Sequence, residues 1–215
     1  MPTSEPVPAE QFDDMPQQRR ASVLGMWTFL VTELLLFGGA FSAFAIFRVM
    51  HPNVFGEAAH HLDLKLGAIN TAILLSSGMT MFLAEQAVSA GRRRLALGML
   101  CSTIGLGVVF LGIKGYEWSK EAAHNLAPVL GQPFHFPGDS PGIAELFFNF
   151  YYTLTGMHAA HMLVGLIILA VMVVLVWRWR DGYRLDRQTR VVGLYWAFVD
   201  VIWIFVFTSL YLLRG

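Results

Sequence analysis

Charged residues are scarce in this chain of 215 residues: only 14% are Asp, Glu, Lys or Arg, whereas 55% are hydrophobic. Soluble domains typically carry about 25% charged residues. The shortage therefore excludes an ordinary soluble domain and predicts a protein that crosses a membrane several times. Acidic and basic residues balance to a formal net charge of zero, so the composition indicates no nucleic-acid partner.

Cysteine is almost missing as well, because Cys101 is the only one. A single cysteine excludes an internal disulfide, a CxxC site, a cysteine-ligated iron–sulfur cluster and a two-cysteine copper centre within this chain. Cys101 lies inside a hydrophobic run, and free cysteines are usually buried. We therefore expect it to be a small packing residue.

Proline is missing from the middle of every long hydrophobic run. All nine prolines lie in the N-terminal segment or in loops around residues 52 and 128–141, as is typical of continuous helices joined by irregular connections. Five runs reach the roughly 20 residues that a helix needs to cross about 30 Å of hydrocarbon. They cover residues 23–47, 66–88, 95–116, 144–177 and 191–213. The prediction is an all-α fold, a polytopic membrane bundle with five transmembrane helices.

The N-terminal segment is polar and lacks the short apolar core of a secretory signal. We expect residues 1–22 to form a flexible cytoplasmic tail and residues 23–215 to form a single five-helix transmembrane domain. Ten arginines fall in this tail and in the loops on its side of the membrane, against five basic residues on the other side. The bias predicts a cytoplasmic N-terminus and an external C-terminus. An aromatic belt near the inner boundary would contain Trp27, Trp177, Trp179 and Trp196.

Two acids, Glu33 and Asp200, lie deep inside the first and fifth hydrophobic runs. A charge at the centre of a membrane helix costs at least roughly 2.5–3.5 kcal/mol, so both acids need an explanation. Their helices run in the same direction and place them at similar depth, where they could share a proton or pair with other polar groups. Since two bare carboxylates cannot both ionise cheaply in a low dielectric, we expect at least one to be protonated. Each could be a hydrogen-bonding group between helices, a proton-linked site, or a contact to a partner or lipid.

Other polar residues inside the predicted membrane point to helix contacts. His158 and His161 lie on one face of the fourth run, and the remaining histidines all fall in loops. A haem held by two histidines needs ligands from facing helices, so haem binding within this chain is not expected, and a metal site would need more ligands at that depth. Hydrogen-bonding histidines at a helix contact are the better interpretation. Asn70 belongs to a polar stripe that predicts contact between helices, and Glu117 is expected at the end of the third run.

Glycines recur every seven residues in the third run, at Gly98, Gly105 and Gly112. They share one helix face, and small residues let membrane helices approach closely. We expect this stripe to pack inside the bundle, with an external dimer seam as the alternative. Replacing Gly105 by leucine is accordingly expected to disrupt packing.

Several short motifs occur in a fixed order along the chain. They are MWTFLVTE (26–33), LGAINT (66–71), GYEW (115–118), TGMHAAH (155–161) and LYWAFVDVIW (194–203). From residue 24 to the C-terminus, the ordered set resembles subunit III of the haem-copper respiratory oxidases, best known from cytochrome c oxidase, in the five-helix bacterial form. One position departs from the family: Ala197 stands where a histidine usually follows the helix tryptophan, Trp196.

The resemblance implies a chain without a catalytic or redox centre, in a complex that is an enzyme as a whole. Haem and copper would lie in a catalytic subunit I, with subunit II as a further partner, in the bacterial cytoplasmic membrane. The chain would bind phospholipid in a cleft and support the stability and proton supply of the catalytic subunit in aerobic respiration. Glu33 would be the family's buried helix acid. Polar structural positions would be His158, His161, Glu117 and Asp200.

Alternatives remain open within and outside this family. The partner enzyme could be a quinol oxidase or a nitric oxide reductase rather than a cytochrome c oxidase. A proton-coupled transporter that uses Glu33 and Asp200 is the competing interpretation from another class, although no internal repeat or pair of broken helices supports it. An independent haem or quinone protein fits the histidine positions poorly.

Overall fold

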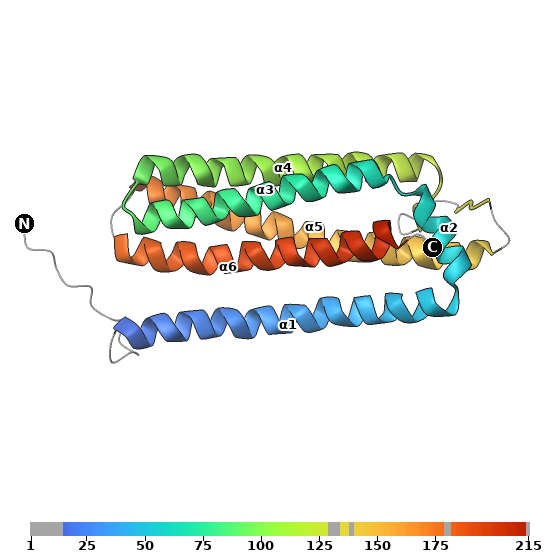
Figure 1. The fold of residues 1–215 in the computed structure, drawn as a ribbon, viewed down its shortest axis with the longest axis horizontal. Coiled ribbons are helices and arrows are strands. Elements are labelled where there is room, and N and C mark those ends of the chain that lie inside the picture. Colours follow the sequence, from blue (N-terminus) through green and yellow to red (C-terminus); the bar gives the residue numbers. More distant parts are fainter. Residues whose placement is uncertain (1–14, 129–133, 138–139, 179–181, 214–215) are drawn as a thin grey trace, which may run out of the picture.

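The computed structural model describes residues 15–128, 134–137, 140–178 and 182–213, and every regular element in these ranges is helical. The long helices lie side by side (Figure 1). Their bounds are α1 Met15–Met50, α3 Leu64–Ser89, α4 Arg93–Ala123, α5 Pro141–Arg178 and α6 Gly182–Phe207, which continues into the π-helical segment η2, Thr208–Leu212. Each of the five is long and apolar enough over part of its length to cross a membrane. The predicted all-helical bundle with five spanning helices is confirmed, while its orientation in the membrane stays a prediction.

Two boundaries differ from those expected. The helix α1 already begins at Met15, so residues 15–22 are helical rather than an irregular tail. The helix α4 continues to Ala123, past the expected end at residue 116. An apolar run therefore indicates only the part of a helix that lies inside hydrocarbon. Backbone hydrogen bonds extend the helix into the polar residues on either side.

A short helix, α2 (Pro52–His61), replaces the irregular loop expected after residue 51. Proline is well suited to the first turn of a helix, where its missing N–H would have no helical partner. The helix buries Phe55, Ala58 and Ala59 and crosses the end of the bundle between α1 and α3 (Figure 1). Phe55 packs edge-on against Phe147 of α5, with ring centroids 5.4 Å apart. The α2 segment therefore joins α1 to the rest of the core.

Asp63 caps the N-terminus of α3. Its carboxylate accepts hydrogen bonds from the backbone amides of Lys65 and Leu66 at 3.1 and 3.2 Å and lies 3.4 Å from the Lys120 ammonium. Partial burial acts to raise the pKa of Asp63, but the hydrogen bonds from Leu66 and Lys120 outweigh it and hold the pKa below its usual range. The cap satisfies amides that the first helical turn leaves free.

The helix α6 is the central element. It contacts α3, α5 and α1, while α4 packs against α3 and α5. Among the five spans, α6 has the largest buried share and α1 the smallest. In Figure 1, α1 lies along one side of the other long helices. The structure is thus a four-helix bundle of α3 to α6 with α1 docked against α5 and α6.

Trp196 of α6 fills the centre of the four-helix bundle. It is fully buried, so its predicted place in an interfacial belt is wrong; Trp27 and Trp177 are exposed, and Trp179 lies outside the described residues. A Cβ on Gly165 would come within 2.8 Å of the Trp196 ring, and one on Gly107 within 3.2 Å. Because glycine has no Cβ, these two positions leave room for the Trp196 indole, and any larger residue would take up that room.

The glycine stripe of α4 faces away from the bundle. A Cβ added at Gly98, Gly105 or Gly112 would meet no other group within 4 Å. The prediction that this stripe packs inside the bundle is therefore wrong, as is the expected disruption by leucine at Gly105 within this chain. Cys101, expected to be buried, is exposed on the same helix. A seven-residue repeat identifies a face, but the neighbours of the helix decide whether that face is covered.

These contacts predict that two similar substitutions differ in their effect on stability. Gly165→Ala should lower the free energy of unfolding by about 1–3 kcal/mol, because the new methyl group overpacks the Trp196 site. Gly105→Ala adds the same methyl group to open space and serves as the matched control. Thermal unfolding of the purified protein in detergent measures both. Equal stability of the two variants would contradict the packing described for Trp196.

Candidate functional site

Glu33 of α1 and His161 of α5 form a polar pair between two membrane-spanning helices. The Glu33 Oε2 atom lies 2.9 Å from His161 Nε2, and both side chains are less than 20% exposed. The ring of Phe37 covers the histidine at a centroid distance of 5.2 Å. Tyr195 of α6 donates a hydrogen bond to the His161 backbone carbonyl at 3.0 Å. The pair thus joins α1 to α5, and α6 supports it.

The surroundings of His161 determine where its protons lie. The Nδ1 atom is 2.8 Å from the carbonyl oxygen of Met157, and a carbonyl only accepts hydrogen bonds, so Nδ1 carries a proton. The contact between Nε2 and Glu33 then needs one further proton, bound either to the imidazole or to the carboxyl group. Either position of this proton is compatible with the 2.9 Å distance between Oε2 and Nε2.

Asp200 lies in a different environment. Its side chain is only 7% exposed, and its Oδ1 atom has no hydrogen-bond partner among the described residues. It projects over α3, where a Cβ added to Gly78 would clash with Oδ2. No hydrogen bond or ion pair joins Asp200 to Glu33 within the described part of the chain. Of the arrangements expected for the two acids, the structure shows separate sites rather than a shared proton.

The other predicted polar residues connect α3, α4, α5 and α6. His158 lies with Nε2 3.2 Å from the carbonyl of Val199, so Nε2 is the protonated nitrogen. Asn70 donates to the carbonyl of Phe110 at 3.4 Å, and Trp196 donates to the hydroxyl of Ser77 at 3.0 Å. His158 and His161 therefore serve different contacts although they share a helix face.

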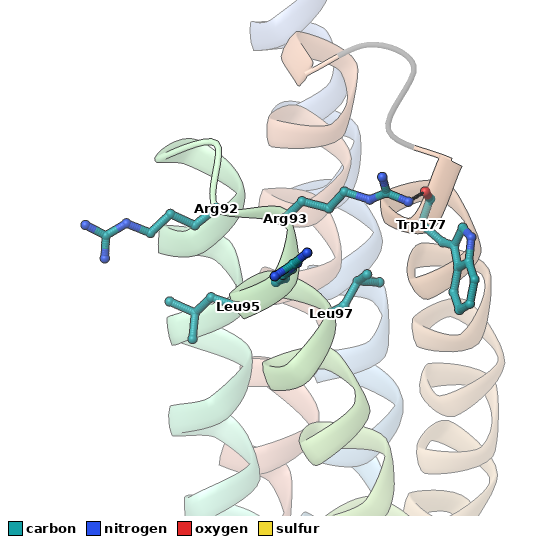
Figure 2. A pocket seen from close by; sticks show the side chains of 6 residues that line it. Arg92, Arg93, Leu95, Leu97 and Trp177 are labelled. Carbon is teal, nitrogen blue, oxygen red and sulfur yellow. Dashed lines mark hydrogen bonds between the residues drawn. The ribbon is translucent and has the colours of Figure 1, made fainter.

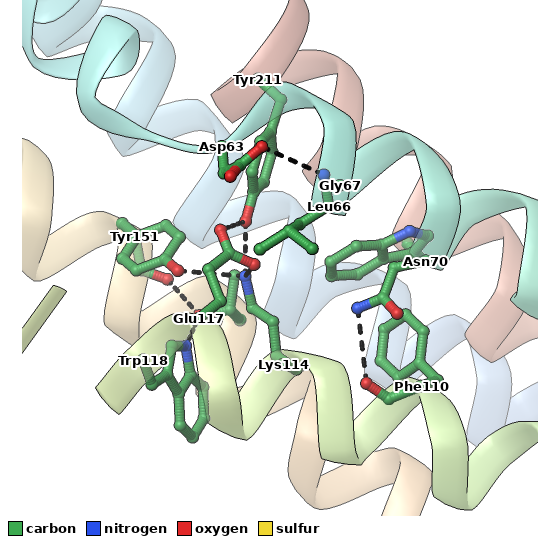
Figure 3. A network of polar contacts seen from close by, with 12 residues as sticks. Asp63, Leu66, Gly67, Asn70, Phe110, Lys114, Glu117, Trp118, Tyr151 and Tyr211 are labelled. Atoms are coloured by element: carbon green, nitrogen blue, oxygen red, sulfur yellow. Dashed lines mark hydrogen bonds and ion pairs between the residues drawn. The ribbon is translucent and has the colours of Figure 1, made fainter. Parts of the chain in front are cut away.

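A buried ion pair lies near the end of the bundle that carries α2 (Figure 3). Lys114 of α4 donates to Glu117 at 3.1 Å, to Tyr151 of α5 at 3.1 Å and to Tyr211 of η2 at 2.5 Å. Tyr211 in turn donates to the second oxygen of Glu117. Lys114 and Glu117 are at most 1% exposed, and Glu121, one turn beyond, is also buried. Segments of α4, α5 and η2 therefore enclose the Lys114 ammonium group. Each of its three N–H donors has a partner.

Sequence reasoning missed this network. Glu117 was expected at the end of the third hydrophobic run, and Lys114 was counted only among the five basic residues on the external side of the membrane. The available signal was the spacing, since a lysine and a glutamate three residues apart can pair on one helix face. Nothing in the sequence indicated Tyr151 and Tyr211 as partners, because they come from distant segments.

Several hollows lie at the surface of the membrane-spanning helices in the described part of the chain. One, of about 720 Å³, lies beside the start of α4 and the end of α5 and is lined by Arg92, Arg93, Arg94 and Trp177 among others. Figure 2 shows Arg93 reaching across to donate to the backbone carbonyl of Trp177. Another, of about 400 Å³, lies between α1 and α6. Its lining includes Arg48, whose Nη1 atom has no hydrogen-bond partner in the described residues.

The described residues contain no group of three or more His, Cys, Asp or Glu side chains that could hold a metal ion. The polar groups instead form pairs and hydrogen bonds between helices. Chemically, this arrangement can hold protons and stabilise helix contacts.

Comparison with known proteins gives a consistent result. The family described as "Cytochrome c oxidase subunit III" matches residues 14–214. Cytochrome c oxidase subunit 3 of Thermostichus vulcanus is 35% identical over 196 residues, covering 89% of this chain and 87% of the relative.

Relatives named for quinol oxidases are similar over the same range. The cytochrome bo(3) ubiquinol oxidase subunit 3 of Pseudomonas aeruginosa is 29% identical over 195 residues, covering 89% of this chain and 85% of its own. A probable quinol oxidase subunit 3 of Staphylococcus epidermidis is 27% identical over 208 residues, covering 95% of each chain. The match over nearly the whole chain, together with five spanning helices, shows that this chain belongs to the cytochrome c oxidase subunit III family, in its five-helix form.

Proposed function

We propose that this chain is a subunit III without redox centres in a haem-copper terminal oxidase of a bacterial cytoplasmic membrane. Subunit I, and with it subunit II, would carry the haem and copper and catalyse the reaction. The observation that supports the proposal most is the family match across residues 14–214. The pairing of the buried acid Glu33 with His161, both within motifs that resemble the family, agrees with it. In this proposal the N-terminus is cytoplasmic, as the distribution of arginines predicts.

A role in the stability of the complex is supported by the rigid core of the chain. Lys114, Glu117 and Tyr211 join α4 to the end of α6, and Trp196 packs against glycines of α4 and α5. Because these contacts hold α4, α5 and α6 together, the helices can present a defined surface to a neighbouring subunit in the membrane. This role requires no reaction within the chain itself.

A role in lipid binding is supported by the hollow between α1 and α6. Apolar side chains line it, among them Phe37, Phe41 and Phe205, and Arg48 lies at the end near Met50. A guanidinium group near the end of a spanning helix can reach a phosphate at the membrane boundary. The apolar lining would then contact the acyl chain of the same phospholipid.

A role in proton supply is supported by the contact between Glu33 and His161, which needs a proton on one of the two side chains. The pair lies about 15 Å along α1 from the start of its span at Val23. It is partly exposed at the side of the bundle, where a neighbouring subunit could contact it. The chain would hold protons close to the catalytic subunit rather than use them itself.

The electron donor distinguishes the remaining candidates. The Thermostichus vulcanus relative is named for a cytochrome c oxidase, which favours cytochrome c, whereas the relatives named for quinol oxidases favour quinol. A nitric oxide reductase partner is a further alternative from sequence. A stand-alone proton-coupled transporter is the alternative from another class, but the separate surroundings of Glu33 and Asp200 support it poorly.

The proposal is tested by isolating the tagged chain from its native membrane in a mild detergent. We expect a haem-bearing subunit to co-purify and the isolated complex to reduce oxygen. Activity with reduced cytochrome c or with a quinol then identifies the donor. A complex that reduces nitric oxide instead would assign the chain to another branch, and isolation as a colourless single chain would overturn the proposal.

The proton-linked role predicts the effect of Glu33→Gln. Glutamine can keep the hydrogen bond to His161 but cannot exchange a proton, so the complex should assemble with normal yield while sustained turnover and proton uptake fall. The loss should be smaller than the roughly 100-fold or more that removing a direct acid–base group costs. Thr32→Val on the same helix is the control, because Thr32 is exposed and bonds only to its own helix. Unchanged proton uptake in Glu33→Gln would show that the pair is purely structural.

The buried ion pair predicts a large stability effect for Lys114→Met. Removing the lysine leaves the buried Glu117 carboxylate without its cation, which should cost about 3–5 kcal/mol in the free energy of unfolding. Adding Glu117→Leu should restore most of the loss, because the double variant has no unpaired charge. Lys120→Met is the control, since the exposed pair of Lys120 and Asp63 is worth about 1 kcal/mol or less. Thermal unfolding of all four proteins completes the comparison, and equal effects at Lys114 and Lys120 would contradict it.

A further inference from the structure

A groove of about 680 Å³ runs along the outside of the bundle over α6, between α1 and α3. Its walls are mostly apolar and exposed: Trp27 of α1 and Leu75 and Phe82 of α3 are all more than half exposed. Polar groups occur at two levels. Asp200 lies at one level, and Glu85 and Arg190 lie at the other. We call this surface the Asp200 groove.

Asp200 is incompletely satisfied within the chain. The side chain is nine-tenths buried, yet its Oδ1 atom has no hydrogen-bond partner among the described residues. A carboxyl group in either protonation state keeps an oxygen that can accept a hydrogen bond. Leaving such a buried group unpaired is unfavourable, and more so where hydrocarbon replaces water. The missing group is therefore a hydrogen-bond donor that enters the groove from outside.

Small residues make the floor of the groove accessible to a large neighbour. Ala197, one helical turn before Asp200, is exposed and lines the groove, and Gly78 and Gly193 also belong to its lining. Small side chains at such positions allow the backbone of another helix to approach closely. Ala197 has no polar side-chain atom that could pair with Asp200.

The depth of Asp200 argues against a lipid headgroup as this donor. Asp200 lies about 22 Å along α6 from Leu185 and about 18 Å from Leu212, the ends of the span. Headgroups lie outside the roughly 30 Å of hydrocarbon, and acyl chains carry no donor. A trapped water needs several polar partners, whereas the lining next to Asp200 includes the apolar Ala197, Val201 and Ile204.

At the second level of the groove, Arg190 is 41% exposed and only loosely paired. Arg190 lies 3.8 Å from Glu85 and 3.8 Å from Asp186, which is too long for a hydrogen bond. Its buried Nε atom has no hydrogen-bond partner in the described part of the chain. Arg190 precedes Asp200 by about 15 Å along α6. The groove thus offers an acceptor in the middle of the membrane and a donor nearer its end.

We propose that a transmembrane helix of a partner subunit packs into the Asp200 groove and donates a hydrogen bond to Asp200 from a polar side chain in the middle of the membrane. The same helix carries an acceptor for Arg190 about 10 or 11 residues away, because this spacing spans three turns on one helix face. The identity of the partner as the catalytic subunit rests on the proposed function. The polar groups expected on the partner helix follow from Asp200 and Arg190 alone and do not depend on that function.

Photo-crosslinking in the intact complex, in native membranes, tests the groove directly. Leu75 is replaced by the photo-reactive amino acid benzoyl-phenylalanine at the rim of the groove. Leu163 of α5 is the matched control, since the two leucines are 52% and 54% exposed and Leu163 does not line the groove. We expect the Leu75 position to form an adduct with one membrane-spanning segment of another subunit, identified by mass spectrometry, with a polar donor in that segment.

Two substitutions then separate packing from hydrogen bonding. Ala197→Leu fills the groove beside Asp200, and Asp200→Leu removes the acceptor; each should reduce the Leu75 adduct roughly tenfold, equivalent to about 1.4 kcal/mol. Asp200→Asn keeps an acceptor oxygen and should retain the adduct. Ala170→Leu, at an exposed position of α5, is the control for added bulk. Thermal unfolding of each variant shows that the chain remains folded.

The outcomes distinguish this inference from the proposed function. Adducts with lipid alone or with a second copy of this chain, or equal adducts from Leu75 and Leu163, would overturn the groove as a helix-docking site, even if a haem-bearing subunit co-purifies. An adduct with the helix of another membrane protein, without any haem-bearing partner, would support the groove and overturn the oxidase assignment. Retention of the adduct in Asp200→Leu would overturn the hydrogen bond to Asp200.

Discussion

Hydrocarbon provides no hydrogen-bond partners, and this constraint governs where polar side chains lie in this subunit. The helices satisfy the backbone, so only side chains remain to be paired. Glu33 finds His161 across two helices, and Lys114 finds Glu117 and two tyrosines. Asp200 retains an oxygen without a partner among the described residues. Asp200 thus differs from Glu33 and Glu117, and its unpaired oxygen lies next to the groove over α6.

Packing around α6 explains why these pairs can form with definite geometry. The Trp196 indole fills space left by Gly107 and Gly165, which brings α4, α5 and α6 close together. Tyr195, the preceding residue, then reaches the carbonyl of His161. Because aromatic side chains are large and have few rotamers, a shift of α6 would displace several contacts at once. The core therefore fixes the position of α5, on which the partner of Glu33 lies.

The subunit combines a closed core with an open side. The ion pair at the end near α2 is enclosed on all sides, as its burial shows. The Glu33 pair, the Arg48 hollow and the Asp200 groove all lie where α1 meets or flanks the other helices. Since α1 is the least buried span, this side has room for lipid and for a neighbouring helix. A subunit of a respiratory oxidase can thus act through the groups it holds and the surfaces it presents.

The sequence by itself determined the membrane class, the five spanning helices, the family and the presence of two unusual acids, because these follow from composition, hydrophobic runs and ordered motifs. It did not determine which side chains contact one another across helices. The glycine repeat from Gly98 to Gly112 indicated one helix face, yet that face proved open, and nothing in the sequence indicated that Lys114 is buried. Only the tertiary structure decided these points, and it alone paired Glu33 with His161 across 128 residues of chain. Helical periodicity defines which residues share a face, whereas the rotation of each helix about its axis is set by packing against its neighbours.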